Sequence, residues 1–376
     1  MLINSDSANG DDAAAGGGQI VIKQSALGPM PDSAQSISIT PDDSRVALLA
    51  NAGSRKIVYV DGKASEPYSA VQQASMMTQG GPPPTLLMLS PDKTAVAYMA
   101  TKDGSKWMMV VNGKNGPEFD RILSALFAPT GHRLAYIGIK DQKQCVVVDD
   151  ATGPMYDQLL PGELVFSADG QHLAYPAQNR TGKAEWKAVV DGKEQQAYPG
   201  VDHVTWSPKG GHCAYVARTS NSQEFSVVVD GKAGPKFQQI DSLTYSADGE
   251  HVGYSGLKLN DPKAPSYVQH WTAVIDGQAG PDFERTSKIS FSPAGGHWAY
   301  TGYATNNSRM AAYAVVDGKK SMNYDECGTY TWSADGAHLA YIGTNSGKQV
   351  AVLDGNESDA HQSIDSTSMQ FNADGS

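Results

Sequence analysis

The chain has 376 residues, among them 40 acidic and 29 basic side chains, which give a formal net charge of −11 at pH 7. This acidic balance argues against nonspecific binding to nucleic acid or to anionic membranes, so we expect no nucleic-acid partner. No apolar run reaches the about 18 residues of a membrane-spanning helix, so we expect no membrane insertion, and the three cysteines form neither a disulfide framework nor a Cys-x-x-Cys metal site.

Residues 1–18 are small and polar, so they predict a disordered tail ahead of one domain over residues 19–376. They lack the basic start and the apolar run of a signal peptide. The sequence therefore leaves the compartment open, and a location outside the cytoplasm would require a truncated N-terminus. The chain stops inside an incomplete unit at Asn372, as expected for a fragment of a longer protein.

A turn of the type Ser-Pro-Asp-Gly divides this domain into units of roughly 40 residues. These residues in this order favour a type I turn. A short stretch with alternating faces follows each turn and predicts a strand, which in most units contains a tyrosine. The turns open at Thr40, Ser90, Ala128, Ser167, Ser207, Ser246, Ser292 and Ser333, with a partial ninth at Asn372, and the tyrosines are Tyr98, Tyr136, Tyr175, Tyr215, Tyr254, Tyr300 and Tyr341.

A second strand in each unit is rich in β-branched residues and ends in Asp-Gly or Asn-Gly, the strongest local signal of a tight hairpin. The third unit departs from this pattern, with Asp149 and Asp150. A Gly-Pro-x-aromatic segment, as at residues 116–119 and 234–237, then predicts an edge strand, because proline has no N–H to donate. A last strand, such as residues 204–206, leads into the next turn.

Four short antiparallel strands per unit predict an all-β fold, a β-propeller whose blades stack because one unit cannot bury its own faces. A sandwich or a barrel would use similar strands but would not explain the regular recurrence. Eight full units and two leading strands near residues 20–22 and 28–29 favour eight blades, with seven and nine as alternatives.

The sequence Ser-Pro-Asp-Gly-x-x-Leu-Ala-Tyr, followed by a strand that ends in Asp-Gly, resembles the bacterial WD40-like repeat of TolB-type propellers over residues 20–376. The resemblance implies the propeller fold. Repeats of this kind occur in non-catalytic binding proteins and as accessory domains of peptidases. The Gly-His and Trp-Asp signature of true WD40 repeats is absent.

The polar residues that recur in every unit are expected to serve the fold, and we predict neither a metal nor a cofactor. Equivalent residues of neighbouring blades lie about 10 Å apart, too far to share a zinc ion. The tyrosines are expected to pack between blades with their hydroxyls at the rim, and turn chemistry explains the Asp-Gly aspartates without calcium. One column of solvated strand starts holds His172, His212, His251, His297 and His338, and it also holds Arg45, Ala95 and Arg133.

Motifs of common catalytic sites are missing: Gly-x-Ser-x-Gly, His-Glu-x-x-His, the P-loop and the dinucleotide fingerprint do not occur. The sequence therefore favours a non-catalytic function. The alternative is a hydrolase, with a site assembled from loops of several blades, or the accessory propeller of a hydrolase whose catalytic domain lies outside this chain.

The remaining connections vary in length and should lie on the face opposite the two uniform turns. Variable loops on a rigid scaffold are common binding sites, although insertions are also tolerated at little cost. We predict that this face binds a protein, a peptide or a small ligand, whereas a purely structural repeat would have a bland face. A connection over residues 69–85 belongs to this face, and the candidate binding residues are Asn179, Arg180, Arg218, Asn221, Lys263, Tyr267, Tyr303, Asn306, Asn307 and Arg309.

Overall fold

The computed structural model describes residues 34–39, 45–72, 88–180, 185–220, 224–259 and 269–372. Within them the chain is all-β apart from two short 3-10 helices, η1 (Pro161–Glu163) and η2 (Ser366–Ser368). No helix in these ranges is long and apolar enough to cross a membrane. The predicted tail and the leading strands near residues 20–22 and 28–29 lie outside the described residues.

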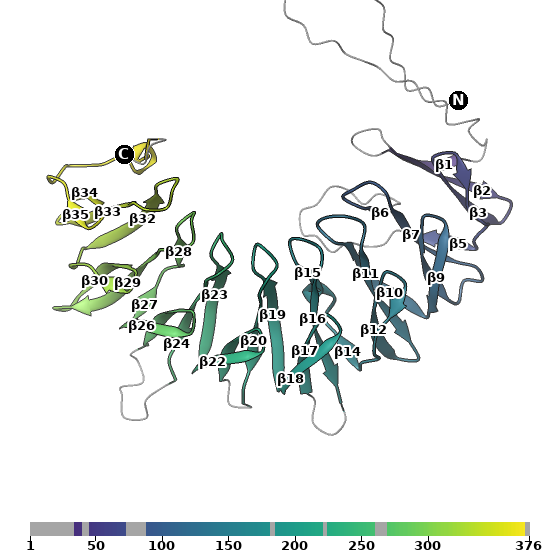
Figure 1. Cartoon of the computed structure of the whole chain (residues 1–376), viewed down its shortest axis with the longest axis horizontal. Coiled ribbons are helices and arrows are strands. Elements are labelled where there is room, and N and C mark those ends of the chain that lie inside the picture. Colours follow the sequence, from purple (N-terminus) through teal and green to yellow (C-terminus); the bar gives the residue numbers. More distant parts are fainter. Residues whose placement is uncertain are drawn as a thin grey trace, which may run out of the picture. The chain divides into compact units, whose positions relative to one another are not determined.

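Eight antiparallel sheets follow one another along the described chain (Figure 1), which confirms the predicted fold of eight four-stranded propeller blades. We number the blades 1–8 and name the strands of each a to d in chain order. The chain forms two compact units, Met1–Met155 with blades 1–3 and Tyr156–Ser376 with blades 4–8, and each is described by itself.

In the first unit, blade 1 comprises β1 (Ala34–Ile39), β2 (Val46–Ala52), β3 (Arg55–Val60) and β4 (Lys63–Ala64). Blade 2 comprises β5 (Ala70–Gln72) and β6 (Met88–Leu89), which together form strand a, then β7 (Val96–Thr101), β8 (Trp107–Val111) and β9 (Lys114–Phe119). Blade 3 comprises β10 (Arg121–Phe127), β11 (Leu134–Lys140), β12 (Lys143–Val148) and β13 (Ala151–Thr152).

In the second unit, blade 4 comprises β14 (Gln158–Leu159) and β15 (Val165–Phe166), then β16 (Leu173–Asn179), β17 (Glu185–Val190) and β18 (Lys193–Tyr198). Blade 5 comprises β19 (Gly200–Trp206), β20 (Cys213–Arg218), β21 (Phe225–Val229) and β22 (Lys232–Phe237). Blade 6 comprises β23 (Gln239–Tyr245), β24 (Val252–Leu257), β25 (Trp271–Ile275) and β26 (Gln278–Phe283). Blade 7 comprises β27 (Arg285–Thr286) and β28 (Ser290–Phe291), then β29 (Trp298–Asn306), β30 (Arg309–Val316) and β31 (Lys319–Lys320), and blade 8 comprises β32 (Glu326–Trp332), β33 (Leu339–Asn345), β34 (Lys348–Leu353) and β35 (Asn356–Glu357).

Each sheet is a simple meander in which strand a pairs with b, b with c and c with d. The Ser-Pro-Asp-Gly type of turn joins strands a and b, and we call it the opening turn. The strand before each opening turn therefore belongs to the same sheet as the strand after it, so each sheet begins one strand before its turn. The Asp-Gly turn joins strands c and d, and the middle connection joins b and c.

The Asp-Gly turns have the geometry that their sequence predicts. In blade 5, φ is 48° at Asp230 and 77° at Gly231, the two left-handed residues of a type I′ hairpin turn. Blade 3 keeps this geometry with Asp149 at 48° and Asp150 at 69°, because aspartate tolerates the left-handed region better than most side chains. The hairpin is thus preserved without the glycine.

The apolar core lies between consecutive sheets. Between blades 5 and 6, Val227 and Phe237 of the first pack against Tyr254 and Val274 of the second, and all four are buried. Phe237 meets Tyr254 edge to face, with ring centroids 6.0 Å apart. A Cβ on Gly256 would collide with the ring of Phe237, so this strand position needs glycine.

The predicted position of the column tyrosine hydroxyls is wrong. Instead of lying at the rim, four of them are buried and have no hydrogen-bond partner among the described residues. They belong to Tyr136, Tyr215, Tyr254 and Tyr300. Burial raises the pKa of each of these phenols well above its ordinary value. The rings fill the space between blades so completely that their polar ends are enclosed as well.

Candidate functional site

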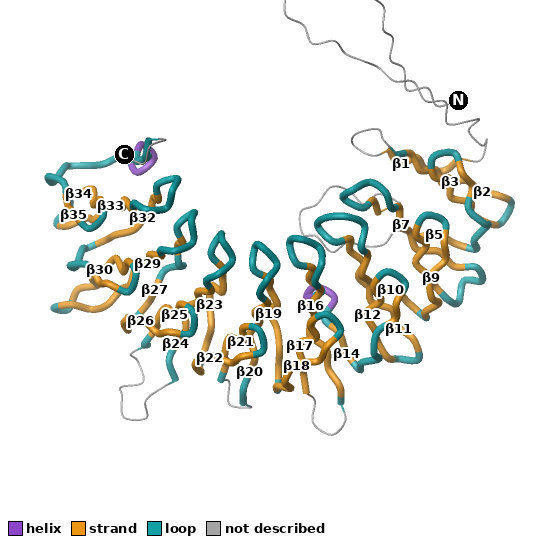
Figure 2. The backbone as a smooth tube through the Cα atoms, viewed as in Figure 1, coloured by secondary structure: helices purple, strands orange, loops and turns teal. Residues whose placement is uncertain are grey.

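The two ends of a blade differ in their connections. In the second unit, Figure 2 shows the opening turns following one another along one side. The turn between strands b and c of blade 7, at Asn307 and Ser308, lies at the opposite ends of its strands. The opening turns and the Asp-Gly turns share one end because successive turns of a meander alternate. We call this the turn end, and the other the hairpin end.

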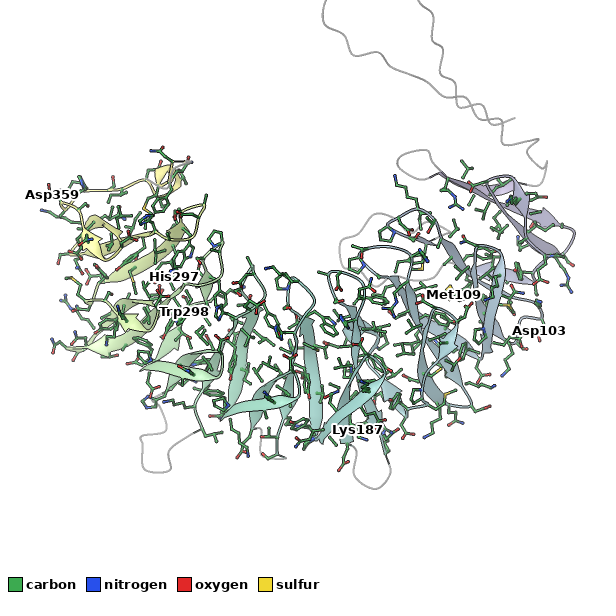
Figure 3. The ribbon with its side chains drawn as sticks, viewed as in Figure 1. Asp103, Met109, Lys187, His297, Trp298 and Asp359 are labelled. Atoms are coloured by element: carbon green, nitrogen blue, oxygen red, sulfur yellow. The ribbon has the colours of Figure 1, made fainter. Side chains whose placement is uncertain are left out.

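At the turn end, each histidine of the repeated column contacts the aspartate of its own Asp-Gly turn. In blade 7, whose His297 and Trp298 are labelled in Figure 3, His297 Nδ1 lies 2.7 Å from Asp317 Oδ2, and the backbone N–H of Trp298 donates to Asp317 Oδ1 at 3.0 Å. The aspartate therefore ties the start of strand b to the c–d turn. The same contact joins His172 to Asp191, His212 to Asp230, His251 to Asp276 and His338 to Asp354.

Where the strand-start column lacks histidine, the residue at the c–d turn matches the replacement in charge. Arg45 pairs with Asp61 at 2.5 Å in blade 1. In blade 2 the column residue is Ala95, and the turn residue is the neutral Asn112 instead of aspartate. Asn112 still accepts from the backbone N–H of Val96 at 2.9 Å. The pairing is thus a clasp that holds the sheet together, and its sequence signal is the joint occurrence in one unit of His or Arg at the start of strand b and Asp at the c–d turn.

The described residues of the turn end do not gather the groups that a metal or a thiol nucleophile needs. Within the described ranges no three His, Cys, Asp or Glu side chains come close enough to hold one metal ion. Burial raises the pKa of the Cys213 thiol to about 12 and that of Cys327 to about 11, so both are protonated at neutral pH. Thiol catalysis has no support in these two residues.

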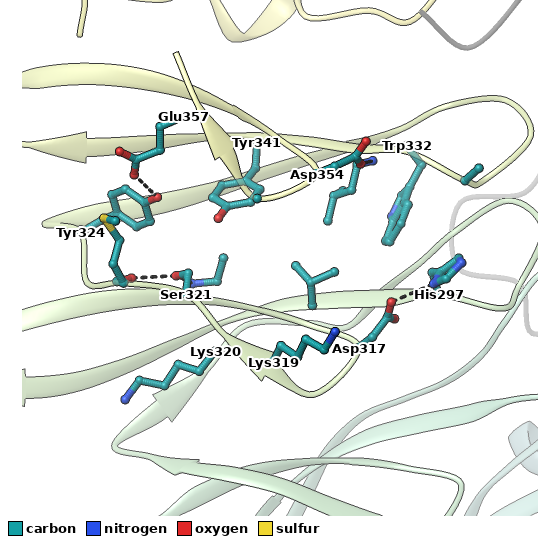
Figure 4. Close-up of a pocket in the computed structure, with 16 residues that line it drawn as sticks. His297, Asp317, Lys319, Lys320, Ser321, Tyr324, Trp332, Tyr341, Asp354 and Glu357 are labelled. Carbon is teal, nitrogen blue, oxygen red and sulfur yellow. Dashed lines mark hydrogen bonds and ion pairs between the residues drawn. The ribbon is translucent and has the colours of Figure 1, made fainter. Parts of the chain in front are cut away.

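Cavities of about 450, 460 and 260 Å³ occupy equivalent places between blades 7 and 8, blades 5 and 6, and blades 4 and 5. Each is lined by a clasp histidine and its aspartate, and by the column tyrosine of the next blade. The pocket between blades 7 and 8, shown in Figure 4, adds Lys319, Lys320 and Glu357 to this common set. Because the repeat itself generates these spaces, the common lining is structural.

The predicted binding residues are only partly described. Asn221, Lys263, Tyr267 and most of the 69–85 connection lie outside the described residues. Asn179 ends β16. The guanidinium of Arg180 donates to the Gln178 side chain at 3.1 Å, and that of Arg218 to the Pro199 carbonyl at 2.7 Å. These two arginines are therefore bound to their own blades.

The connection that carries Tyr303, Asn306, Asn307 and Arg309 is an extended hairpin and not an irregular loop. β29 has nine residues and β30 eight, and they pair up to Asn306 and Arg309. Asn307 and Ser308 close the hairpin with φ values of 48° and 64°, as in a type I′ turn. A rigid ladder therefore carries the predicted residues Tyr303, Asn306, Asn307 and Arg309.

One face of this hairpin carries a cation, an aromatic ring and a thioether. The pairing of Arg285 with Tyr303 and of Thr305 with Met310 places Arg285, Tyr303 and Met310 on the same face. The guanidinium carbon of Arg285 lies 4.2 Å from the centroid of the Tyr303 ring, in the range of a cation–π contact. Met310 is 51% exposed. Arg309 stands next to Met310 in β30, so it lies on the opposite face of the ladder, at the exposed tip of the hairpin. We call Arg285, Tyr303, Met310 and this tip residue the blade 7 patch.

No protein-family model matches the chain, and no curated protein does. Among solved structures, the chain is similar to the eukaryotic initiation factor, with a TM-score of 0.35, 10% identity and 91% of each chain covered. It is similar to the β-propeller domain of the Trilobed protease from Pyrococcus furiosus, with a TM-score of 0.31, 13% identity, and 78% of this chain and 98% of that chain covered. It is also similar to TolB from Acinetobacter baumannii, with a TM-score of 0.27, 12% identity, and 84% of this chain and 80% of that chain covered. Likeness at these scores carries no argument about function, which has to come from the surface of this chain.

Proposed function

We propose that the chain is a non-catalytic propeller scaffold of the bacterial WD40-like, TolB-type kind, and that it binds a protein or peptide segment through the blade 7 patch. The observation that carries the proposal is the exposed Met310 on a rigid, two-stranded hairpin. An exposed side chain of this size on an ordered element marks an interaction surface when aromatic and arginine side chains adjoin it.

The composition of the patch fits a binding site. Arginine, tyrosine and methionine are enriched in the buried centres of protein interfaces. Because the ladder fixes the backbone, little conformational entropy is lost when a partner binds. The alternative of a hydrolase has weaker support, since the clasp histidines and aspartates are used in pairs within the sheets and the described thiols of Cys213 and Cys327 are protonated.

The test selects ligands on the wild-type protein and then challenges them with variants. Peptides of 12 random residues, displayed on phage, are selected on the immobilised full chain, and their affinities for purified variants are measured. Tyr303→Ala and Met310→Ala should each weaken binding by roughly tenfold, the effect of losing about 1.4 kcal/mol at an interface centre.

The matched control is Leu353→Ala, which removes another exposed apolar side chain (50% exposed) from blade 8. Circular dichroism verifies that all three variants are folded. If the selected peptides bind Tyr303→Ala and Met310→Ala as tightly as the wild type, the blade 7 patch is not the binding site.

A further inference from the structure

Charge is distributed very unevenly over the last three blades. Residues 284–324, which contain blade 7 and the Glu284 that is hydrogen-bonded to its β29, carry five basic side chains and two acidic ones. The preceding segment, 239–283, carries six acidic and two basic side chains, and the following segment, 325–372, carries seven acidic and one basic. Blade 7 is therefore a positive island between two acidic blades in a chain whose net charge is −11.

The cations of the blade 7 patch are not neutralised within the described structure. Neither Arg285 nor Arg309 forms an ion pair with a described carboxylate. The guanidinium group of Arg285 lies over the Tyr303 ring. Two lysines at the hairpin ends of other blades, in contrast, form ion pairs. Lys106 pairs with Asp120 in blade 2, and Lys258 pairs with Asp282 at 2.6 Å in blade 6. The patch thus keeps two guanidinium groups available to a partner.

We infer that the partner segment recognised at this patch is acidic, with carboxylates for Arg285 and Arg309 and an apolar side chain for Met310 and Tyr303. This inference rests on the proposed function and specifies its partner. Arginine suits this role because its planar guanidinium binds carboxylates in a two-pronged geometry and stays charged. The Tyr303 ring holds one guanidinium in place, so less rotational freedom is lost on binding.

The acidic neighbours limit how long the anionic part of the partner is. Blades 6 and 8 lie on either side of blade 7, since β29 packs against both β26 and β32. Stacked sheets are about 10 Å apart, and the Debye length in physiological salt is about 8 Å. A short acidic segment is attracted mainly by the basic side chains of blade 7. A long polyanion such as a nucleic acid is also repelled by the carboxylates of blades 6 and 8.

The experiment uses three fluorescein-labelled 12-residue peptides in which leucine alternates with glutamate, glutamine or lysine. Fluorescence anisotropy measures their affinities for the full chain at 0.05 M and 0.5 M NaCl. The Glu–Leu peptide should bind more tightly than the Gln–Leu peptide at low salt, and high salt should remove the difference. A uridine 12-mer of equal or greater charge should bind more weakly than the Glu–Leu peptide.

Charge-reversing substitutions test whether Arg285 and Arg309 cause the tighter binding of the Glu–Leu peptide. The double variant R285E/R309E should weaken Glu–Leu binding at least roughly tenfold and leave Gln–Leu binding within about twofold. The control is Lys348→Glu, because Lys348 begins β34 as Arg309 begins β30, and it pairs with Asn345 as Arg309 pairs with Asn306. It should leave Glu–Leu binding unchanged, apart from the small effect of net charge.

The outcomes separate this inference from the proposed function. Equal affinities for the Glu–Leu and Gln–Leu peptides, both weakened by Met310→Ala, would retain the binding surface and reject an acidic partner. Tighter binding of the uridine 12-mer would also reject it. If none of the probes binds, or if Met310→Ala and R285E/R309E change nothing, both the acidic partner and the patch itself are rejected.

Discussion

At the scale of single residues, a pairing rule links the aromatic residue seven positions after the aspartate of each c–d turn to the second residue after the next blade's c–d turn. Tyr68 donates to Asn115 at 2.8 Å, and Tyr324 donates to Glu357 at 2.5 Å. Where the aromatic residue is Phe237, the corresponding residue is Ala279. A hydroxyl is thus present where the next blade supplies an acceptor.

Tyr198 breaks this rule. Replacing tyrosine by phenylalanine should therefore change the free energy of unfolding in opposite directions at Tyr198 and at the equivalent Tyr324. The counterpart of Tyr198 is Ala233, and the buried hydroxyl of Tyr198 has no partner among the described residues. Tyr198→Phe should raise the free energy of unfolding or leave it unchanged, because it removes an unsatisfied polar group. Tyr324→Phe should lower it by about 1 kcal/mol, because the bond to Glu357 is lost. Urea unfolding of the two variants measures both changes, and equal effects at the two sites would contradict the rule.

A second residue-scale prediction concerns the enclosed hydroxyl of Tyr254. The nearby side chains of Tyr324 and Ser321 oppose the rise that burial causes in the pKa of Tyr341, whereas Gly234 stands at the position of Ser321 beside Tyr254. A Cβ on Gly234 would lie 3.1 Å from the Tyr254 hydroxyl oxygen. Gly234→Ser should therefore stabilise the protein by about 0.5–1 kcal/mol, by supplying a partner and by restricting the unfolded chain.

Its matched opposite is Ser321→Gly, which should destabilise the protein by a similar amount. Thermal unfolding by circular dichroism compares the two with the wild type. A lower melting temperature for Gly234→Ser would mean that the tyrosine ring cannot move by the few tenths of an ångström that the new Cβ requires.

The sequence predicts these residues only in part. The tyrosine column is visible as a repeat, and its role between blades follows from its regular spacing. The burial of its hydroxyls does not follow, because it depends on what the neighbouring blade places opposite, and Gly234 and Ser321 occur in otherwise similar sequences. The clasp of His297 and Asp317 was missed for a related reason: each column has its own local explanation, so their contact emerges only when strands a to d are paired.

At the scale of elements, the opening turns of the second unit form a column in which acidic residues alternate with other types. Asp169, Asp248 and Asp335 stand at the third turn position of blades 4, 6 and 8, whereas Lys209 and Ala294 stand there in blades 5 and 7. The first unit does not follow this order, because Asp42 of blade 1 and Asp92 of blade 2 are consecutive in the column. In the second unit, alternation keeps like charges two blades apart, which limits their mutual repulsion.

The glycine of the opening turn in blade 7 gives a prediction with its control next to it. Gly295 has φ of 87°, and a Cβ there would collide with the carboxylate of Asp248, whereas a Cβ on Gly296 would meet nothing within 4 Å. Gly295→Ala should therefore destabilise the protein by about 2 kcal/mol or more. Gly296→Ala should have little effect or stabilise slightly. The midpoints of urea unfolding measure the stability of the two variants. An equal loss of stability in both would show that the turn does not depend on this close approach.

The opening turns also predict how stability depends on acid. In blade 6 the hydrogen bond from the Ser246 hydroxyl lowers the pKa of Asp248, helped by the backbone N–H of Glu250. Ser167 and Ser333 lower the pKa of Asp169 and Asp335 in the same way. A carboxyl whose pKa is lower in the folded state stabilises the protein above its unfolded pKa. That contribution is lost as the pH falls through the folded value.

Stability should therefore decrease as the pH falls below about 4, the ordinary range of an aspartate. Asp248→Asn should reduce the steepness of this loss, since the amide keeps the hydrogen bonds without titrating. The control is Asp359→Asn on an exposed part of blade 8. Melting temperatures between pH 2.5 and pH 7 measure the profile, and an unchanged slope in Asp248→Asn would exclude this turn as a source of the acid sensitivity.

The hairpin of blade 7 shows where element prediction from sequence failed. Tyr303 to Arg309 contains Asn307 and Ser308, and polar residues of this kind are typical of both loops and tight turns. The alternation of side chains over Tyr303 and Thr305 is short, and the turn that follows contains no glycine. The sequence therefore favours an irregular connection. The turn chemistry of Asn307, which tolerates positive φ, is the signal that would have shown a hairpin.

At the scale of the whole molecule, stacking makes the stability of each blade depend on its neighbours. In the second unit, strand c is least buried in blade 8. Val227, Val228 and the equivalent Ala273, Val274 of blades 5 and 6 are buried, whereas in blade 8 only Val352 of β34 is buried and Leu353 is 50% exposed. A sheet with fewer buried contacts opens more easily.

Hydrogen exchange measured by mass spectrometry should therefore show different exchange rates in the third strands of this unit. Amides of β34 should exchange faster than those of β21 and β25, although all three are third strands hydrogen-bonded on both sides. Leu353→Asp should leave the exchange of β34 nearly unchanged, because that side chain is already exposed. Val352→Ala should accelerate it and also loosen β33, since the buried Val352 packs with Leu339 and Tyr341. Uniform exchange across β21, β25 and β34 would mean that the five blades of this unit open as one cooperative body, and that burial within each interface does not set its local stability.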